Sequence, residues 1–132
     1  MKNREILKNY NTLMARSMNE KKEIEKNKDY QRLPIKVIHA IYTNQIALEK
    51  ALEPYAKAVI ALGNKYNVEM TIFNLNIKRN EIAAELVADF DKELKELLDV
   101  EVDVDINKIS IDSFGDYQIS QEDYELIAFM IR

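Results

Sequence analysis

The sequence predicts a mainly α-helical protein with a small β component (α+β). We expect an antiparallel helical hairpin, flanking N- and C-terminal helices, and a small antiparallel β element. Apolar residues recur at helical spacing through most of the chain. Gly and Pro number only two each, which leaves few residues for the turns of a sandwich or barrel. Residues 99–111 then switch to alternating acidic and aliphatic side chains, a pattern typical of a strand.

The first predicted helix covers residues 3–18, and its apolar face is expected to consist of Ile6, Leu7, Tyr10, Leu13, Met14 and Met18. Residues 19–32 are nearly all polar. They form either an exposed helix extension, a loop, or a basic contact arm for a partner. The basic side chains of this arm are Lys21, Lys22, Lys26, Lys28 and Arg32.

The central helix is predicted over residues 33–66, where apolar side chains recur every three or four residues as a heptad seam. Pro34 suits the first turn of this helix because its missing N–H would be unpaired there in any case. Pro54 either kinks a continuous helix or starts a new one, and the unbroken heptad phase favours the kink. The only polar seam residue, Gln45, is a candidate for a hydrogen bond in the core. The seam consists of Ile38, Ile41, Gln45, Leu48, Leu52, Tyr55, Val59, Leu62 and Tyr66.

Residues 67–76 can be read as a short strand or as a linker. A second long helix is predicted over residues 76–98, and it would pair with the central helix in the antiparallel hairpin. Val100 to Ile106 predict a half-buried strand, and Ile109 begins a second alternating piece. Ser120 is expected to cap a terminal helix over residues 121–132, which is apolar on most sides and should be buried.

The chain has 132 residues, the size of one domain. We therefore expect a single domain, organised as residues 1–32, 33–98 and 99–132. It contains no cysteine, which excludes disulfides, thiolate nucleophiles and cysteine zinc sites and favours a reducing compartment. No apolar run approaches the ~20 residues needed to cross a bilayer, and the first residues do not resemble a signal peptide. These observations predict a cytoplasmic protein without membrane association.

Charge is distributed unevenly along the chain. Residues 1–50 hold 11 Lys/Arg and 6 Asp/Glu, a net charge of +5, whereas residues 51–132 hold 8 and 17, a net charge of −9. The overall negative charge argues against general nucleic-acid binding. The acidic half instead predicts a surface for a basic partner. Its candidate binding residues are Glu85, Asp89, Glu93, Glu96, Asp99, Glu101, Asp103 and Asp105.

No pattern in the chain points to an enzyme, a cofactor or a metal. The row of carboxylates after Leu98 would spread along a strand, whereas hard cations need several oxygens that converge on one point. The sole histidine, His39, has Ile35 and Thr43 at its helical neighbours and so lacks a carboxylate to orient it for acid–base catalysis. We therefore expect a protein without catalytic residues, cofactor or metal.

Two segments together resemble a known group of proteins. These are LPIKVIHAIYTNQIALEKALEPY at residues 33–55, and residues 92–132 from KELKELLDVEVDVDINKISIDSF through ISQEDYELIAFMIR. Their order is similar to that in a family of small uncharacterised proteins encoded by phages and prophages of low-GC Gram-positive bacteria. The family has no established function, so the resemblance implies a bacterial host cell but no catalytic residues. The longer polar stretch at residues 19–32 and the connector at 67–76 depart from the family pattern.

The sequence thus predicts a non-enzymatic phage accessory protein that binds another protein. An inhibitor of a bacterial defence nuclease, acting like an anti-CRISPR protein through its acidic face, fits the size and the charge. The alternative is a structural or assembly component of the virion that self-associates through the long seam and the apolar terminal helix. The periodicity does not distinguish a seam that meets its own chain from one that meets a second copy, and it does not name the partner.

Overall fold

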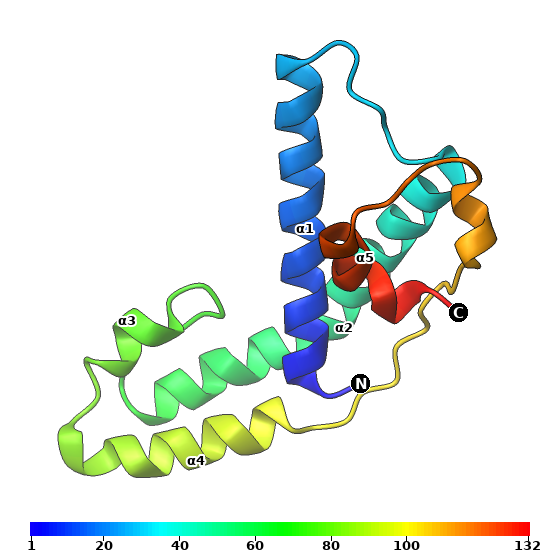
Figure 1. Cartoon of the computed structure of the whole chain (residues 1–132). Helices are drawn as coiled ribbons and strands as arrows, with labels where there is room; N and C mark the ends of the chain where they lie inside the picture. The colour runs from blue at the N-terminus through cyan, green and yellow to red at the C-terminus, as the bar shows by residue number, and fades with distance from the viewer. The chain divides into compact units, whose positions relative to one another are not determined.

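The computed structural model describes all 132 residues and is mainly helical (Figure 1). It contains no β-strand. Two isolated bridges pair Lys2 with Glu101 and Ile109 with Ile131. The predicted helical architecture is therefore confirmed, whereas the predicted small antiparallel β element is not formed. The α-helices are α1 (Asn3–Lys26), α2 (Ile35–Lys65), α3 (Leu75–Arg79), α4 (Val87–Leu98) and α5 (Gln121–Ile127), and the 3-10 turns are η1 (Ala84–Leu86), η2 (Ile111–Phe114) and η3 (Ala128–Met130).

The chain divides into two compact units. The first unit consists of Met1–Ile6 and Ala51–Asp103, and the second consists of Leu7–Lys50 and Val104–Arg132. Helices α1 and α2 each contribute residues to both units. The single domain expected from chain length stays a prediction, and the two units are described separately below.

Helix α2 confirms the central seam. It runs through Pro54 without a break, so the helix does not restart there. The apolar seam residues from Ile38 to Val59 are buried, and Leu62 and Tyr66 are half-buried. Gln45 donates hydrogen bonds to the Leu13 carbonyl (3.0 Å) and the Ser17 hydroxyl (2.9 Å). The polar seam position thus ties α2 to α1 inside the second unit.

In the first unit, the Ala51–Lys65 half of α2 and α4 run antiparallel, as the hairpin prediction required (Figure 1). Phe90 is fully buried, and its ring lies nearly perpendicular (89°) to the Tyr66 ring with the centroids 5.5 Å apart. The predicted continuous helix over 76–98 is wrong, because the chain leaves helical geometry between α3 and η1. Ile82 and Phe90 are buried but Leu86 is exposed, a pattern that one straight helix with this four-residue spacing would not give.

The end of α2 shows why residues 67–74 are a linker, which leads into α3 at Leu75. Asn67 takes the left-handed conformation (φ 60°) that often ends a helix. The N–H of Val68 donates to the Gly63 carbonyl (3.0 Å), which turns the chain back over the last helical turn. Val68 and Met70 are buried while Glu69 is exposed. The alternating burial therefore arises because this loop packs against the end of α2, and not because it forms a strand.

Tyr55 is almost completely buried, yet its hydroxyl has no hydrogen-bond partner. Burial also raises the pKa of this phenol. An unmatched buried hydroxyl costs free energy, so we expect Tyr55→Phe to raise the free energy of unfolding by about 1 kcal/mol. Urea unfolding measures the change. Tyr66→Phe is the matched control and should destabilise, because it removes a hydrogen bond to Glu93. A loss of stability in Tyr55→Phe would contradict the expectation.

In the second unit, α1 buries Leu13 and half-buries Leu7 and Tyr10 as predicted, but leaves the two predicted methionines exposed. Leu13 is fully buried and Arg16 is 6% exposed, whereas Met14 and Met18 are 39% and 59% exposed. Successive helical residues are rotated by about 100°. A stripe centred on Leu13 and Arg16 therefore turns both methionines toward solvent. The helix continues to Lys26, so most of the polar stretch at residues 19–32 is an extension of this helix and not a loop.

The terminal region is helical as predicted but shorter. The Ser120 hydroxyl accepts a hydrogen bond from the Asp123 N–H (3.1 Å), which confirms the predicted N-cap. Helix α5 ends at Ile127 and the chain continues as η3. Ile127 and Met130 are fully buried, but Tyr124 is 37% exposed, so burial is confined to one side.

The segment from Val104 to Ser110 is extended without belonging to a sheet. Val104 and Ile106 are half-buried and Asp105 is exposed, as the alternation predicted. The backbone partners are not those of a neighbouring strand. The Asn44 side chain pairs with the Asn107 peptide, and the Ile109 N–H donates to the Met130 carbonyl (2.8 Å). Period-two burial is present here without a β ladder.

Candidate binding surfaces

The first group of predicted acidic residues lies on one side of η1 and α4. Glu85, Asp89 and Glu96 are spaced by four and seven residues, which places them on a common helical face. All three are exposed, and none makes an ion pair or a side-chain hydrogen bond within the chain. These three carboxylates are therefore available to a partner.

Glu93 belongs to the same helix but is occupied within the first unit. Its carboxylate pairs with the Lys65 ammonium and accepts a hydrogen bond from the Tyr66 hydroxyl (2.9 Å). The hydrogen bond from Lys65, followed by that from Tyr66, lowers the pKa of Glu93. Glu93 thus fastens α4 to the end of α2 and is not a free recognition group.

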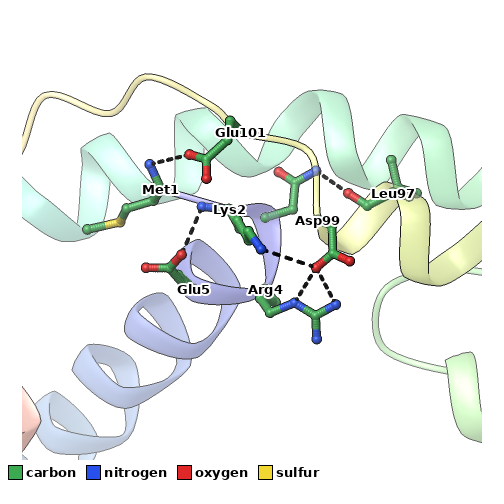
Figure 2. Close-up of polar contacts among 8 residues, drawn as sticks. Met1, Lys2, Arg4, Glu5, Leu97, Asp99 and Glu101 are labelled. Carbon is green, nitrogen blue, oxygen red and sulfur yellow. Dashed lines mark hydrogen bonds and ion pairs between the residues drawn. The ribbon is translucent and has the colours of Figure 1, made fainter.

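Asp99 is also occupied, by the first residues of the chain. The Arg4 guanidinium contacts one Asp99 oxygen through Nε (2.8 Å) and Nη2 (2.6 Å), and the Lys2 ammonium lies 3.9 Å from the same oxygen (Figure 2). The hydrogen bond from Arg4 is the main cause of the lowered pKa of Asp99. The backbone adds a bond from the Asn3 N–H to the Val100 carbonyl (3.0 Å). Asp99 therefore holds the start of α1 against the end of α4.

Acidification should destabilise the first unit through three carboxylates. The pKa values of Asp91, Glu93 and Asp99 are lowered, that of Asp91 mainly by its hydrogen bond from Arg79. A carboxylate with a lowered folded-state pKa contributes stability above its unfolded pKa and loses it as the pH falls through the folded pKa. We expect the urea midpoint to fall below about pH 4 for this reason.

The control for this pH dependence is the triple variant Asp91→Asn, Glu93→Gln, Asp99→Asn. It should be less stable than the parent at neutral pH and should converge with it in acid. A parallel loss of stability in the two proteins would show that other groups control the acid transition.

The second group of predicted acidic residues is Glu101, Asp103 and Asp105, which lie along the extended segment. All three are exposed and alternate with the half-buried Val102 and Val104. Glu101 lies near the amino group of Met1, but 69% of its side chain remains exposed. Asp103 and Asp105 make no ion pair, whereas the Glu101 carboxylate lies 3.4 Å from the Met1 amino group (Figure 2). Nowhere in the chain do three or more His, Cys, Asp or Glu side chains converge as a possible metal site.

The predicted basic arm is exposed but mixed in charge. Lys21, Lys22 and Lys26 lie on the last turns of α1, and Lys28 and Arg32 lie in the following loop. Four acidic residues are interspersed among these five basic ones in residues 19–32. Only Arg32 is paired, at 3.9 Å from a Glu20 oxygen. The arm therefore supplies a local row of lysines without a strong net charge.

A polar cleft of about 520 Å³ between α1 and α5 was missed by the sequence reasoning. Arg16 lies in its wall, 3.6 Å from a Glu20 oxygen and 3.7 Å from an Asp123 oxygen. The Nε and Nη2 atoms of Arg16 are buried without hydrogen-bond partners. The two carboxylates offset the guanidinium charge, so the arrangement joins the two helices electrostatically. The sequence signal for this cleft was the position of Arg16, because a residue three positions after the buried Leu13 lies on the same side of the helix.

None of the helices combines the length and the hydrophobicity that a membrane-spanning helix requires. Comparisons with protein families, curated proteins and solved structures found no match.

Proposed function

We propose that this is a phage- or prophage-encoded accessory protein that acts without catalysis, by binding another protein through its acidic face. The observation that carries the proposal is the exposure of five carboxylates that make no ion pair within the chain. They are Glu85, Asp89, Glu96, Asp103 and Asp105. The target we propose is a bacterial defence nuclease, whose nucleic-acid groove would be basic.

The arrangement of the carboxylates supports a mimic of a nucleic-acid backbone. Side chains two residues apart on an extended segment are about 7 Å apart on the same side. In the first unit, Glu101 and Asp103 thus form a row of negative charges, and η1 and α4 carry the exposed carboxylates of Glu85, Asp89 and Glu96. Asp105 continues the alternation along the chain in the second unit. A basic groove binds phosphates mainly through charge, so a row of carboxylates can compete for it without base-specific contacts.

The decisive experiment is an affinity pulldown from host lysate with identification by mass spectrometry, followed by binding measurements on the purified partner. We expect the variant Glu85→Lys, Asp89→Lys, Glu96→Lys to bind at least about tenfold more weakly, because it places like charges against a basic groove. Binding of the parent should also weaken steeply with added salt.

The matched control reverses three exposed acids elsewhere, in Asp116→Lys, Glu122→Lys, Glu125→Lys. It changes the net charge equally and should retain binding. A second variant, Glu101→Lys, Asp103→Lys, Asp105→Lys, tests the extended row separately. If both acidic-face variants bind as the parent does, the acidic-face mechanism is wrong.

A virion structural or assembly component is the second candidate. Exposed apolar side chains on α1 and α2, including Met18 and Ile46, favour it because such surfaces support self-association. Light scattering of the free protein separates the two. A higher oligomer that persists at high salt would support the virion component, whereas a monomer with salt-sensitive partner binding would support the inhibitor.

A further inference from the structure

The polar cleft between α1 and α5 carries more negative than positive charge, and every residue that lines it belongs to the second unit. Its wall holds a single cation, Arg16, and four carboxylates, which belong to Glu20, Glu23, Glu122 and Asp123. Arg32 is not part of the wall but lies 3.9 Å from a Glu20 oxygen. Even when both arginines are counted against the four carboxylates, two negative charges remain.

Glu23 and Glu122 are the carboxylates available to a ligand. Both are exposed, and neither makes an ion pair or a side-chain hydrogen bond within the chain. Glu23 lies on α1 and Glu122 on α5, so each wall of the cleft attracts a cation. Tyr30, half-buried in the same wall, adds an aromatic ring, and cations are attracted to the faces of such rings.

Arg16 shows that the cleft also lacks a hydrogen-bond acceptor. Its side chain is only 6% exposed, yet its Nε and Nη2 atoms have no hydrogen-bond partner. Its N···O distances to Glu20 (3.6 Å) and Asp123 (3.7 Å) are those of ion pairs. An N–H···O hydrogen bond is shorter, at about 2.7–3.2 Å. Because buried donors without partners cost free energy, an acceptor oxygen beside Arg16 would gain hydrogen bonds that the chain itself does not supply.

We propose that this cleft binds a ligand that carries a protonated guanidinium or ammonium group together with a carbonyl oxygen. The cation lies between Glu23 and Glu122, and the carbonyl lies beside Arg16. A lysine or arginine has both groups, either within a peptide or as a free amino-acid derivative. The cleft volume of about 520 Å³ is typical of ligand pockets. The cleft shares no residue with the acidic face, so the proposal does not rest on the proposed function.

The test uses three small probes and the full-length protein. N-acetyl-arginine amide carries both groups, N-acetyl-citrulline amide has the same shape without the charge, and butylguanidinium has the charge without a carbonyl. Binding is followed on backbone amides by NMR. The amides of Thr12 and Asn19 in the cleft wall should shift to saturation, whereas those of Val59 and Phe90 in the first unit should not.

We expect N-acetyl-arginine amide to bind at least about tenfold tighter than the citrulline probe at low salt, and tighter than butylguanidinium. Glu23→Gln with Glu122→Gln should remove most of this preference and leave the Arg16 ion pairs intact. Glu49→Gln with Asp116→Asn is the matched control. It neutralises two exposed acids of the same unit outside the cleft and should bind as the parent does.

A blocked pentaglycine peptide with a central arginine in place of the third glycine distinguishes the two sources of the ligand. Tighter binding of this peptide than of N-acetyl-arginine amide assigns the cleft to a basic peptide segment, and weaker binding assigns it to a free derivative.

The proposal is wrong if the arginine and citrulline probes bind equally at low salt. It is also wrong if no probe gives a saturable shift at Thr12 and Asn19, because water would then be the only partner of Arg16. Equal binding of butylguanidinium and N-acetyl-arginine amide would overturn it too, since Arg16 would contribute nothing. An undiminished preference in Glu23→Gln with Glu122→Gln would place the cation elsewhere on the protein.

Discussion

Replacing Asn44 by alanine is expected to lower the free energy of unfolding by about 2–4 kcal/mol. The Asn44 side chain is fully buried on α2. Its Oδ1 accepts a hydrogen bond from the Asn107 N–H (2.7 Å), and its Nδ2 donates to the Asn107 carbonyl (3.1 Å). One side chain thus satisfies both backbone groups of a residue that has no neighbouring strand. Alanine removes both bonds and leaves a cavity.

Urea unfolding measures the loss, and hydrogen exchange of the Asn107 amide localises it. The Asn44→Asp variant should be at least as unstable at neutral pH, since it buries a carboxylate and loses the donor to the Asn107 carbonyl. Burial raises the pKa of such a carboxyl, so the variant should recover stability relative to the parent as the pH falls. Thr43→Ala, at the exposed neighbour, should change stability little. Unchanged exchange at Asn107 in Asn44→Ala would contradict this role.

Local patterns predicted the parts of the fold that depend on local physics. The α2 seam follows from a spacing of three and four residues that puts Ile38 through Val59 on one side of a helix, and the hydrogen bond of Ser120 to Asp123 follows from capping over three residues. Both predictions were correct because each depends only on residues of one helix: the seam residues share a face of α2, and Ser120 caps an N–H three residues later.

The strand over Val100 to Ile106 was wrong for a physical reason. Alternation reports which side chains face the protein, and the structure does half-bury Val102, Val104 and Ile106. It does not report where the backbone hydrogen bonds go. In Val100–Ile106 they go to the first residues of the chain, where the Val102 N–H donates to the Met1 carbonyl (2.8 Å) and the Val100 carbonyl accepts from the Asn3 N–H (3.0 Å). These partners are distant in sequence, so no pattern within the segment indicates them.

The binding surfaces were predicted unevenly for the same reason. Exposure of Glu85, Asp89 and Glu96 follows from the amphipathic pattern of η1 and α4. The occupation of Glu93 and Asp99 depends on Lys65 and Arg4, which are distant in sequence. The methionines of α1 were misplaced because an arginine, Arg16, occupies the buried stripe and the apolar count alone favoured the other side.

At Gly63, a contact with the returning chain should outweigh helix propensity, so a substitution that normally stabilises a helix should destabilise this one. Alanine in place of glycine inside a helix normally stabilises by about 1 kcal/mol. Gly63 lies in the last turn of α2, where the returning chain crosses it. A Cβ at this position would lie 2.6 Å from the Met70 Cβ and 2.7 Å from the Val68 carbonyl oxygen. Neither is the flexible end of a side chain, so the backbone must shift.

We expect Gly63→Ala to lower the free energy of unfolding by about 1–3 kcal/mol, the range for overpacking a buried site. Thermal or urea unfolding gives the value. Ala61→Gly, at an exposed position of the same helix, isolates helix propensity and should cost about 1 kcal/mol without disturbing the loop. Because Val68 and Met70 are buried against this turn, Gly63→Ala should also increase exchange of the Val68 amide, which Ala61→Gly should not. A gain in stability in Gly63→Ala would mean that the returning loop does not pack on α2 at this distance.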